Sequence, residues 1–113
     1  MKKFLSILWL AIACAWLTLV PPALAASPEA IATGAKVFNA NCAACHMNGN
    51  NVVDASKNLK AETLHKYNMD SIEAIATQVT NGKNAMPSFR SRLTEDQIQA
   101  VAAYVLNQAE SGW

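Results

Sequence analysis

The chain has 113 residues, of which 52% are apolar and 15% are charged, and its formal net charge is +1. This length allows one small domain. The near balance of charge excludes the strongly basic surface that is typical of nucleic-acid-binding proteins. The three cysteines are too few for the disulfide framework that stabilises many small exported domains.

Residues 1–25 have the pattern of a secretory signal peptide. Two lysines give a basic start, residues 4–20 form an apolar run without a charge, and the following segment ends in Ala-x-Ala at Ala25. The apolar run is at the short limit for a membrane span, so an uncleaved anchor is the weaker alternative. We expect cleavage after Ala25, with Ala26 as the other candidate, which leaves a mature domain of residues 26–113.

The first half of this predicted domain contains two helical patterns. Ser27 precedes a proline and an acid, so we expect it to cap a helix that ends near Asn41. Gly34 lies inside this helix, where glycine costs about 1 kcal/mol relative to alanine; another backbone approaching closely would explain it. A loop over residues 47–58 and a short helix over residues 60–67 are expected next.

Two further helices are predicted in the second half. Asp70 is expected to cap the third helix, with Glu73 at its third position, and Asn81-Gly82 to end it. A capping box from Thr94 to Gln97 begins the last helix. The apolar residues of both helices recur at helical spacing and form one buried face on each. They are Ile72, Ile75, Ala76 and Val79, then Ile98, Val101, Ala102 and Val105. The sequence therefore predicts an all-α, single-domain protein.

The most specific motif runs from Cys42 to His46 and reads Cys-Ala-Ala-Cys-His. This spacing is typical of c-type haem attachment, in which both thiols add to the vinyl groups of one haem and the imidazole ligates the iron. A thioredoxin-type pair would follow a strand, and none is predicted here. A zinc site would need two more paired ligands, and only Cys14 and His65 remain. We therefore expect one haem c per chain, covalently attached through Cys42 and Cys45.

The second axial ligand of the iron distinguishes a closed electron-transfer centre from an open haem that binds gas or peroxide. Met47 adjoins His46 and cannot reach the opposite face of the ring. Met69 is expected to fill the core, and His65 to be a solvated surface residue. Met86 lies in an expected extended segment before a proline, where its thioether can lie along the ring. We predict His46 and Met86 as ligands, with a fairly high reduction potential.

Four stretches beyond the haem motif resemble the cytochrome c6 family. They are Val37–Cys42, Gln78–Lys83, Ala85–Phe89 and Val101–Leu106. The resemblance covers nearly the whole mature region and implies a class I cytochrome c fold of about four helices around one haem. It implies that the first and last helices cross, with Gly34 and Phe38 against Val101 and Tyr104.

The same resemblance implies residue roles and partners. It implies Gln78 and Lys83 as further haem-binding residues and Arg92 as part of the docking interface. The family members are one-electron carriers, not enzymes, that act as small monomers in the thylakoid lumen or a bacterial periplasm. They take electrons from cytochrome f of the cytochrome b6f complex and deliver them to photosystem I or a cytochrome oxidase. The alternative is a haem enzyme or a gas- or peroxide-binding domain with an open sixth position.

Two further expectations follow from the composition and from this family function. A carrier needs an apolar patch at the haem edge for transient docking, and residues 47–53 and 85–89 are the candidates. Haem attachment uses both cysteines of the mature chain and leaves no disulfide. We therefore expect the haem to supply much of the core, and the apo-protein to be largely unfolded.

Overall fold

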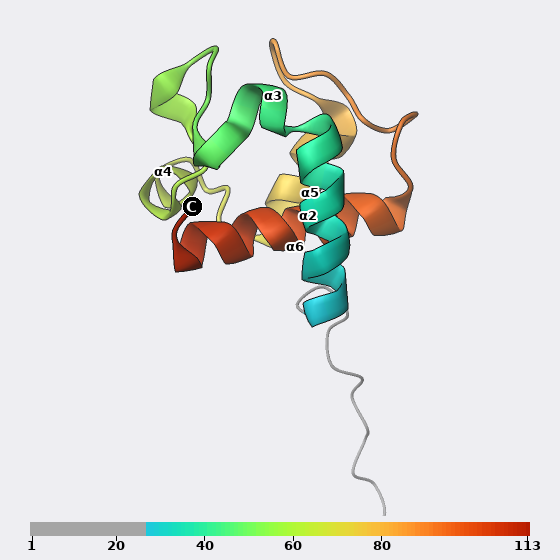
Figure 1. The fold of residues 1–113 in the computed structure, drawn as a ribbon. Helices are drawn as coiled ribbons and strands as arrows, with labels where there is room; N and C mark the ends of the chain where they lie inside the picture. Colours follow the sequence, from blue (N-terminus) through green and yellow to red (C-terminus); the bar gives the residue numbers. More distant parts are fainter. Residues whose placement is uncertain (1–26) are drawn as a thin grey trace, which may run out of the picture.

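The computed structural model describes residues 27–113, and the predicted leader with its cleavage site lies outside the described residues. This part of the chain folds into helices joined by short loops (Figure 1). The helices are α2 (Pro28–Asn41), α3 (Ala43–His46), α4 (Ala61–Lys66), α5 (Ile72–Asn81) and α6 (Glu95–Ser111), with 3-10 turns η2 (Met47–Gly49) and η3 (Ala55–Lys57). Residues 27–113 contain no strand beyond one isolated β-bridge, so the predicted all-α class is confirmed.

The caps of the first and last helices confirm the predicted boundaries. The Ser27 hydroxyl accepts a hydrogen bond from the N–H of Ala30 at 3.1 Å, and α2 ends at Asn41 as expected. At α6 the Gln97 N–H donates to the Thr94 hydroxyl at 3.2 Å, and the Thr94 N–H donates to the Gln97 amide oxygen at 3.0 Å. These reciprocal bonds satisfy backbone donors that have no partner inside the helix.

The predicted cap of α5 was wrong by one residue. Ser71, and not Asp70, is the N-cap: its hydroxyl accepts from the Ala74 N–H at 3.1 Å. The Asp70 carboxylate instead pairs with Nδ1 of His65 at 2.8 Å. Both side chains are of types that commonly cap helices. Because the Asp70 carboxylate is bound to His65 of α4, the Ser71 hydroxyl caps α5. The predicted end of α5 at Gly82, which has φ +70°, is confirmed.

In the segment after α5, which we expected to be extended, Met86 pairs with Lys83 in a β-bridge, but residues 84–85 form a turn. Lys83 and Met86 exchange both backbone hydrogen bonds, at 2.9 Å each, and so close a tight turn. Asn84 lies inside this turn at φ +53°, a left-handed conformation that asparagine tolerates better than most residues. The turn places the side chain of Met86 next to α5.

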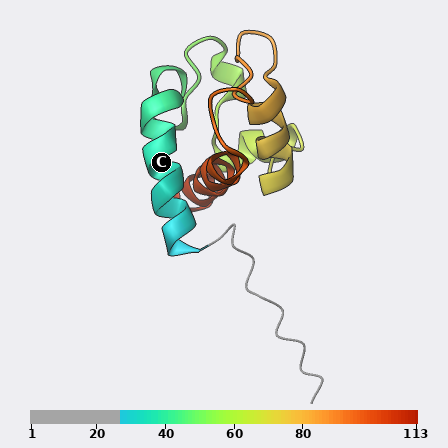
Figure 2. The same cartoon turned by 90° about the vertical axis from the view of Figure 1, so that its right-hand side faces the viewer.

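Helix α6 forms the centre of the core. Figure 2 shows it nearly end-on between α2 and α5. Its four predicted core residues are all buried, whereas on α5 Ile72 is only half-buried. A Cβ added to Gly34 would lie 2.6 Å from Cβ of Tyr104 and would clash with the Ala100 carbonyl. The rings of Phe38 and Tyr104 lie 5.3 Å apart. The implied crossing of the first and last helices is thus confirmed, and it explains the glycine.

Both views place α3, the following loop and the turn over residues 83–86 at the same end of the molecule (Figures 1 and 2). The start of α2 lies at the other end. Across residues 27–113, no helix has both the length and the apolar character needed to cross a membrane; the longest, α6, has 17 residues. The haem motif in α3 therefore lies at the same end of the molecule as the turn that carries Met86.

Candidate haem site

The Cys-Ala-Ala-Cys-His motif itself forms the single turn α3. Cys42 ends α2 by donating its N–H to the Phe38 carbonyl at 2.8 Å. The N–H groups of Cys45 and His46 then both donate to the Cys42 carbonyl, at 3.1 and 2.9 Å. This helical turn holds the two thiols and the imidazole together, with Cys45 exposed and Cys42 half-buried. The turn therefore keeps the three side chains of the motif within one short element.

The half-buried position of Cys42 controls its acidity. Burial, followed by the smaller effect of the neighbouring Cys45 thiol, raises the pKa of Cys42 to about 11. Redox-active Cys-x-x-Cys pairs have the opposite property, because their attacking thiol has a lowered pKa and reacts as a thiolate. The environment of Cys42 therefore disfavours the thioredoxin-type alternative.

A backbone carbonyl orients the imidazole of His46. Nδ1 of His46 lies 3.0 Å from the carbonyl oxygen of Asn50. A carbonyl only accepts, so Nδ1 carries the hydrogen and Nε2 keeps its lone pair for a metal. The chain folds back to make this contact through Asn48 and Gly49, which have φ of +56° and +74°. Metal-bound histidines typically have such a partner on their other nitrogen.

Met86 and Gln78 form the second group of predicted site residues. The amide Nε2 of Gln78, on α5, donates to the sulfur of Met86 at 3.6 Å. Met86 is half-buried and packs against the hydrophobic core. The hydrogen bond fixes the position of the thioether and withdraws electron density from its sulfur. An amide donor placed on a thioether is the kind of contact that tunes a metal ligand.

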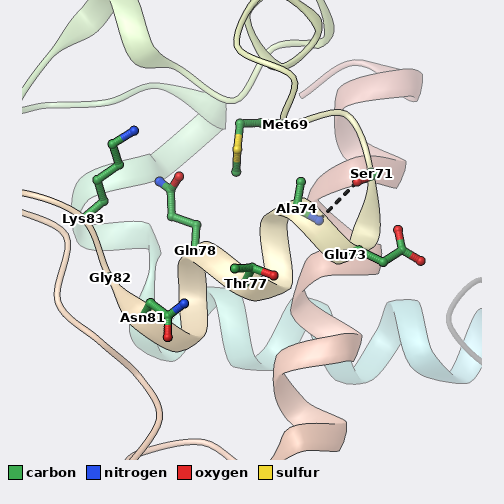
Figure 3. A pocket seen from close by; sticks show the side chains of 9 residues that line it. All are labelled: Met69, Ser71, Glu73, Ala74, Thr77, Gln78, Asn81, Gly82 and Lys83. Carbon is green, nitrogen blue, oxygen red and sulfur yellow. Dashed lines mark hydrogen bonds between the residues drawn. The ribbon is translucent and has the colours of Figure 1, made fainter.

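An open depression of about 590 Å³ lies beside this pair. Met69, Gln78 and Lys83 reach into the same space (Figure 3). Its volume is within the roughly 300–1,000 Å³ range of ligand sites. The Cys42–His46 turn and Met86 do not line it. The depression therefore lies on the side of the site that carries Gln78 and Lys83, and not on the side of Cys42 and Cys45.

Several large apolar side chains that follow α3 are exposed on the surface of the described part of the chain. Met47 is 62% exposed, Val52 71% and Val53 67%, the largest exposures among the big apolar residues of this region. They follow closely in the chain on the two thiols and the imidazole of the motif, the groups that attach a c-type haem and ligate its iron. The residues present thus fit a large apolar ring bound at this end. Residues 47–53 coincide with one of the predicted apolar segments.

The remaining candidates are His65, Arg92 and Cys14. His65 is a surface residue, as expected, with a side chain 83% exposed. Arg92 is also exposed and lies over the ring of Phe89, with its guanidinium carbon 5.7 Å from the ring centroid. Cys14 falls outside the described residues. Within residues 27–113, no group of three or more His, Cys, Asp or Glu side chains could hold a metal ion without the haem.

Comparison with known proteins identifies the family. A family model described as cytochrome c oxidase, cbb3-type, subunit III matches residues 29–105. The cytochrome c6 of Thermostichus vulcanus is 57% identical over 112 residues, which are 99% of this chain and 96% of its own. The chain belongs to the cytochrome c6 family. A second relative, the cytochrome c6 of a Nostoc species, is 53% identical over all 113 residues.

Solved structures show the same cytochrome c6 fold. Cytochrome c6 from the diatom Phaeodactylum tricornutum is 49% identical and matches with a TM-score of 0.72, over 74% of this chain and 98% of its own. Oxidised cytochrome c6A of Arabidopsis thaliana has the same TM-score at 30% identity, over 77% and 97%. The predicted class I cytochrome c fold is thereby confirmed. The protein is a c-type cytochrome of the electron-carrier class with a covalently bound haem, and Cys42 and Cys45 occupy its attachment motif.

Sequence reasoning missed the Asn50 carbonyl as the partner of His46. Every residue has a carbonyl, so no residue type marks the one that a histidine will use. The run of asparagine and glycine residues indicated a loop, but not the pair of left-handed residues, Asn48 and Gly49, that turns the chain back. The contact could be inferred only once the path of the chain was known.

Proposed function

We propose that this cytochrome c6 is a diffusible one-electron carrier whose iron is bound by His46 and Met86. The observation that carries the proposal is the Met86 thioether, held by the Gln78 amide at 3.6 Å in a turn at the same end as the haem motif. The haem, when bound, supplies reversible one-electron chemistry at its iron. A methionine ligand would close the sixth position against small molecules and raise the reduction potential.

The other residues of the site hold and tune the cofactor in this proposal. Cys42 and Cys45 attach it, and the Asn50 carbonyl keeps the His46 imidazole in its ligating tautomer. Gln78 draws electron density from the Met86 sulfur. Lys83, which reaches into the depression beside Gln78, offers a cation to the haem carboxylates.

The proposed partners follow from the family. Cytochrome f of the cytochrome b6f complex donates the electron, and photosystem I or a cytochrome oxidase accepts it. The exposed apolar side chains of Met47, Val52 and Val53 support transient docking at the haem edge. The exposed Arg92 would add a fixed positive charge to this interface. The proposal includes export: residues 1–25 are removed as a leader, and the monomeric domain acts in a thylakoid lumen or bacterial periplasm.

Visible and near-infrared spectra of the holo-protein test the ligands. Methionine ligation gives a weak near-infrared band from sulfur to ferric iron, which should be present in the wild type. Met86→Ala should lose this band, whereas Met69→Ala, a matched change beside the depression, should keep it. Loss of the band in Met69→Ala alone would contradict the assignment of Met86.

An enzyme or a gas- or peroxide-binding domain with an open sixth position is the alternative function. Carbon monoxide added to the reduced protein at neutral pH distinguishes the two. A closed centre should bind it negligibly, and Met86→Ala should bind it at once. Prompt binding by the wild type would favour the alternative and overturn the carrier proposal.

Electron transfer to isolated photosystem I tests the proposed partner and the role of Arg92. Arg92→Gln should slow the second-order rate several-fold at low salt, with the difference shrinking as ionic strength rises. Arg90→Gln is the matched control, because it removes the same charge two residues away, from an exposed guanidinium that donates to the Asn81 side chain at 2.7 Å. Equal effects of the two changes would remove Arg92 from the interface.

A further inference from the structure

Trp113 lies just beyond α6 and contacts the loop that follows the haem motif. Its indole Nε1–H donates to the Leu59 carbonyl at 2.9 Å, between residues 54 positions apart. The N–H of Leu59 in turn donates to the Gly49 carbonyl at 2.7 Å. Leu59 therefore uses both of its backbone polar groups to connect Trp113 to η2.

The indole also packs directly on η2. Gly49 is buried at φ +74°, and a Cβ added to it would lie 2.5 Å from both Cγ and Nε1 of Trp113. The ring therefore covers Gly49 so closely that no side chain fits between them. Other aromatic rings hold the indole in place: its centroid is 5.3 Å from that of Phe38 and 6.1 Å from that of Tyr104. Trp113 is fixed by the helix crossing and in turn fixes η2.

The residue after η2 is Asn50, whose carbonyl accepts the His46 Nδ1–H at 3.0 Å. A shift of Gly49 would move this carbonyl, because the two residues share a peptide bond. The partner of a metal-bound histidine sets both the orientation of the ring and its strength as a donor. We propose that Trp113 is a positioning residue for His46, acting through Leu59 and Gly49 on the Asn50 carbonyl. The inference rests on the proposed axial role of His46.

The first test uses the wild-type holo-protein in its reduced state. Hydrogen exchange of the Trp113 Nε1–H and the His46 Nδ1–H is followed by NMR. If the tryptophan holds the loop, the His46 bond opens only when the indole bond opens. The opening constant of the His46 bond, which is its exchange rate divided by the intrinsic rate of a free imidazole, should therefore equal that of the indole bond or be smaller. A larger opening constant for the His46 bond than for the indole bond would overturn the proposal without any variant.

The second test is the holo-protein with Trp113→Phe, which keeps an aromatic ring at the crossing but removes the N–H donor. The His46 Nδ1–H should exchange about tenfold faster, which corresponds to about 1.4 kcal/mol of easier opening. The reduction potential should rise, because a histidine with a weaker hydrogen bond on Nδ1 is a poorer donor to ferric iron. Unchanged exchange and potential would overturn the proposal.

Thr94→Ala is the matched control for a merely structural effect. It removes the capping box of α6 and should lower the melting temperature by a comparable amount. It should leave the His46 exchange rate and the potential unchanged, because Thr94 has no part in the path from Trp113. Equal changes in both variants would overturn the proposal. A wild-type spectrum without histidine ligation would instead contradict the proposed function. Failure of the Trp113 proposal can therefore be told apart from failure of the proposed ligation by His46.

Discussion

The Gln78 amide on the Met86 sulfur should raise the reduction potential. With Met86 as the proposed ligand, the N–H withdraws electron density from its sulfur, weakens the thioether as a donor to ferric iron and so favours the reduced state. Gln78→Leu removes the donor at similar volume. For one hydrogen bond of about 0.5–1.5 kcal/mol, the potential should fall by roughly 20–60 mV.

A redox titration measures this change, and Gln99→Leu provides its control. The Gln99 side chain donates to Glu95 on α6 and does not touch the Met86 sulfur. Its replacement should leave the potential within experimental error of the wild type. A potential that is unchanged or raised in Gln78→Leu would show that the amide does not act on the ligand in this way.

The contact between His65 and Asp70 predicts a dependence of stability on pH. The hydrogen bond from His65 is the largest of the effects that hold the pKa of Asp70 below its ordinary value. A carboxyl with a lowered pKa stabilises the fold above its unfolded-state pKa of about 4, and this contribution is lost as pH falls through the lower folded-state value. Asp70→Ala should therefore lower the melting temperature at pH 7 and differ less from the wild type at pH 3. A difference that is constant across this range would contradict the prediction.

Gly34 shows how a single element is matched to its neighbour. In an isolated helix, alanine would be favoured over glycine by about 1 kcal/mol. In α2 the added Cβ would meet the backbone of Ala100 and lie 2.6 Å from Cβ of Tyr104, so α2 and α6 would have to move apart. Gly34→Ala should therefore lower the free energy of unfolding by about 1–3 kcal/mol, the usual cost of overpacking.

Chemical denaturation compares this variant with Ala32→Gly. Ala32 is exposed on the same helix, so its replacement should cost about 1 kcal/mol through helix propensity alone. If Gly34→Ala raised the free energy of unfolding, α2 and α6 would be able to move apart without losing packing energy. The glycine would then have no packing role.

The elements that the sequence predicted well are those with strong local rules. Ser27 and the pair Thr94 and Gln97 cap their helices through contacts within four residues, which the order of residues alone determines. The errors arose where two local rules competed. Asp70 and Ser71 can each cap α5, and a residue of another helix decided between them. The tight turn at Met86 likewise depended on Asn84 accepting a left-handed conformation.

At the scale of the whole molecule, the sequence predicted the residues that attach the haem. It did not predict the contacts that hold the His46 imidazole in place. The spacing of Cys42 and Cys45 is a local pattern with a known chemical use. The path from Trp113 to His46 instead joins residues far apart in sequence, through backbone groups that every residue has. Such contacts depend on how α6 crosses α2, and this became known only with the fold.

The whole fold should also depend on the haem. The core clusters along α2, α5 and α6, while the end that carries the attachment motif leaves Met47, Val52 and Val53 largely exposed. Cys42 and Cys45 are both free thiols and residues 27–113 contain no disulfide, so a domain of this size is only marginally stable without its cofactor. We expect protein made without haem, through Cys42→Ala with Cys45→Ala, to lose most of its helical circular dichroism and its cooperative thermal transition. The single change Cys45→Ala should retain one thioether and a native-like fold. A sharp melting transition in the double variant would show that the helices stand without the cofactor.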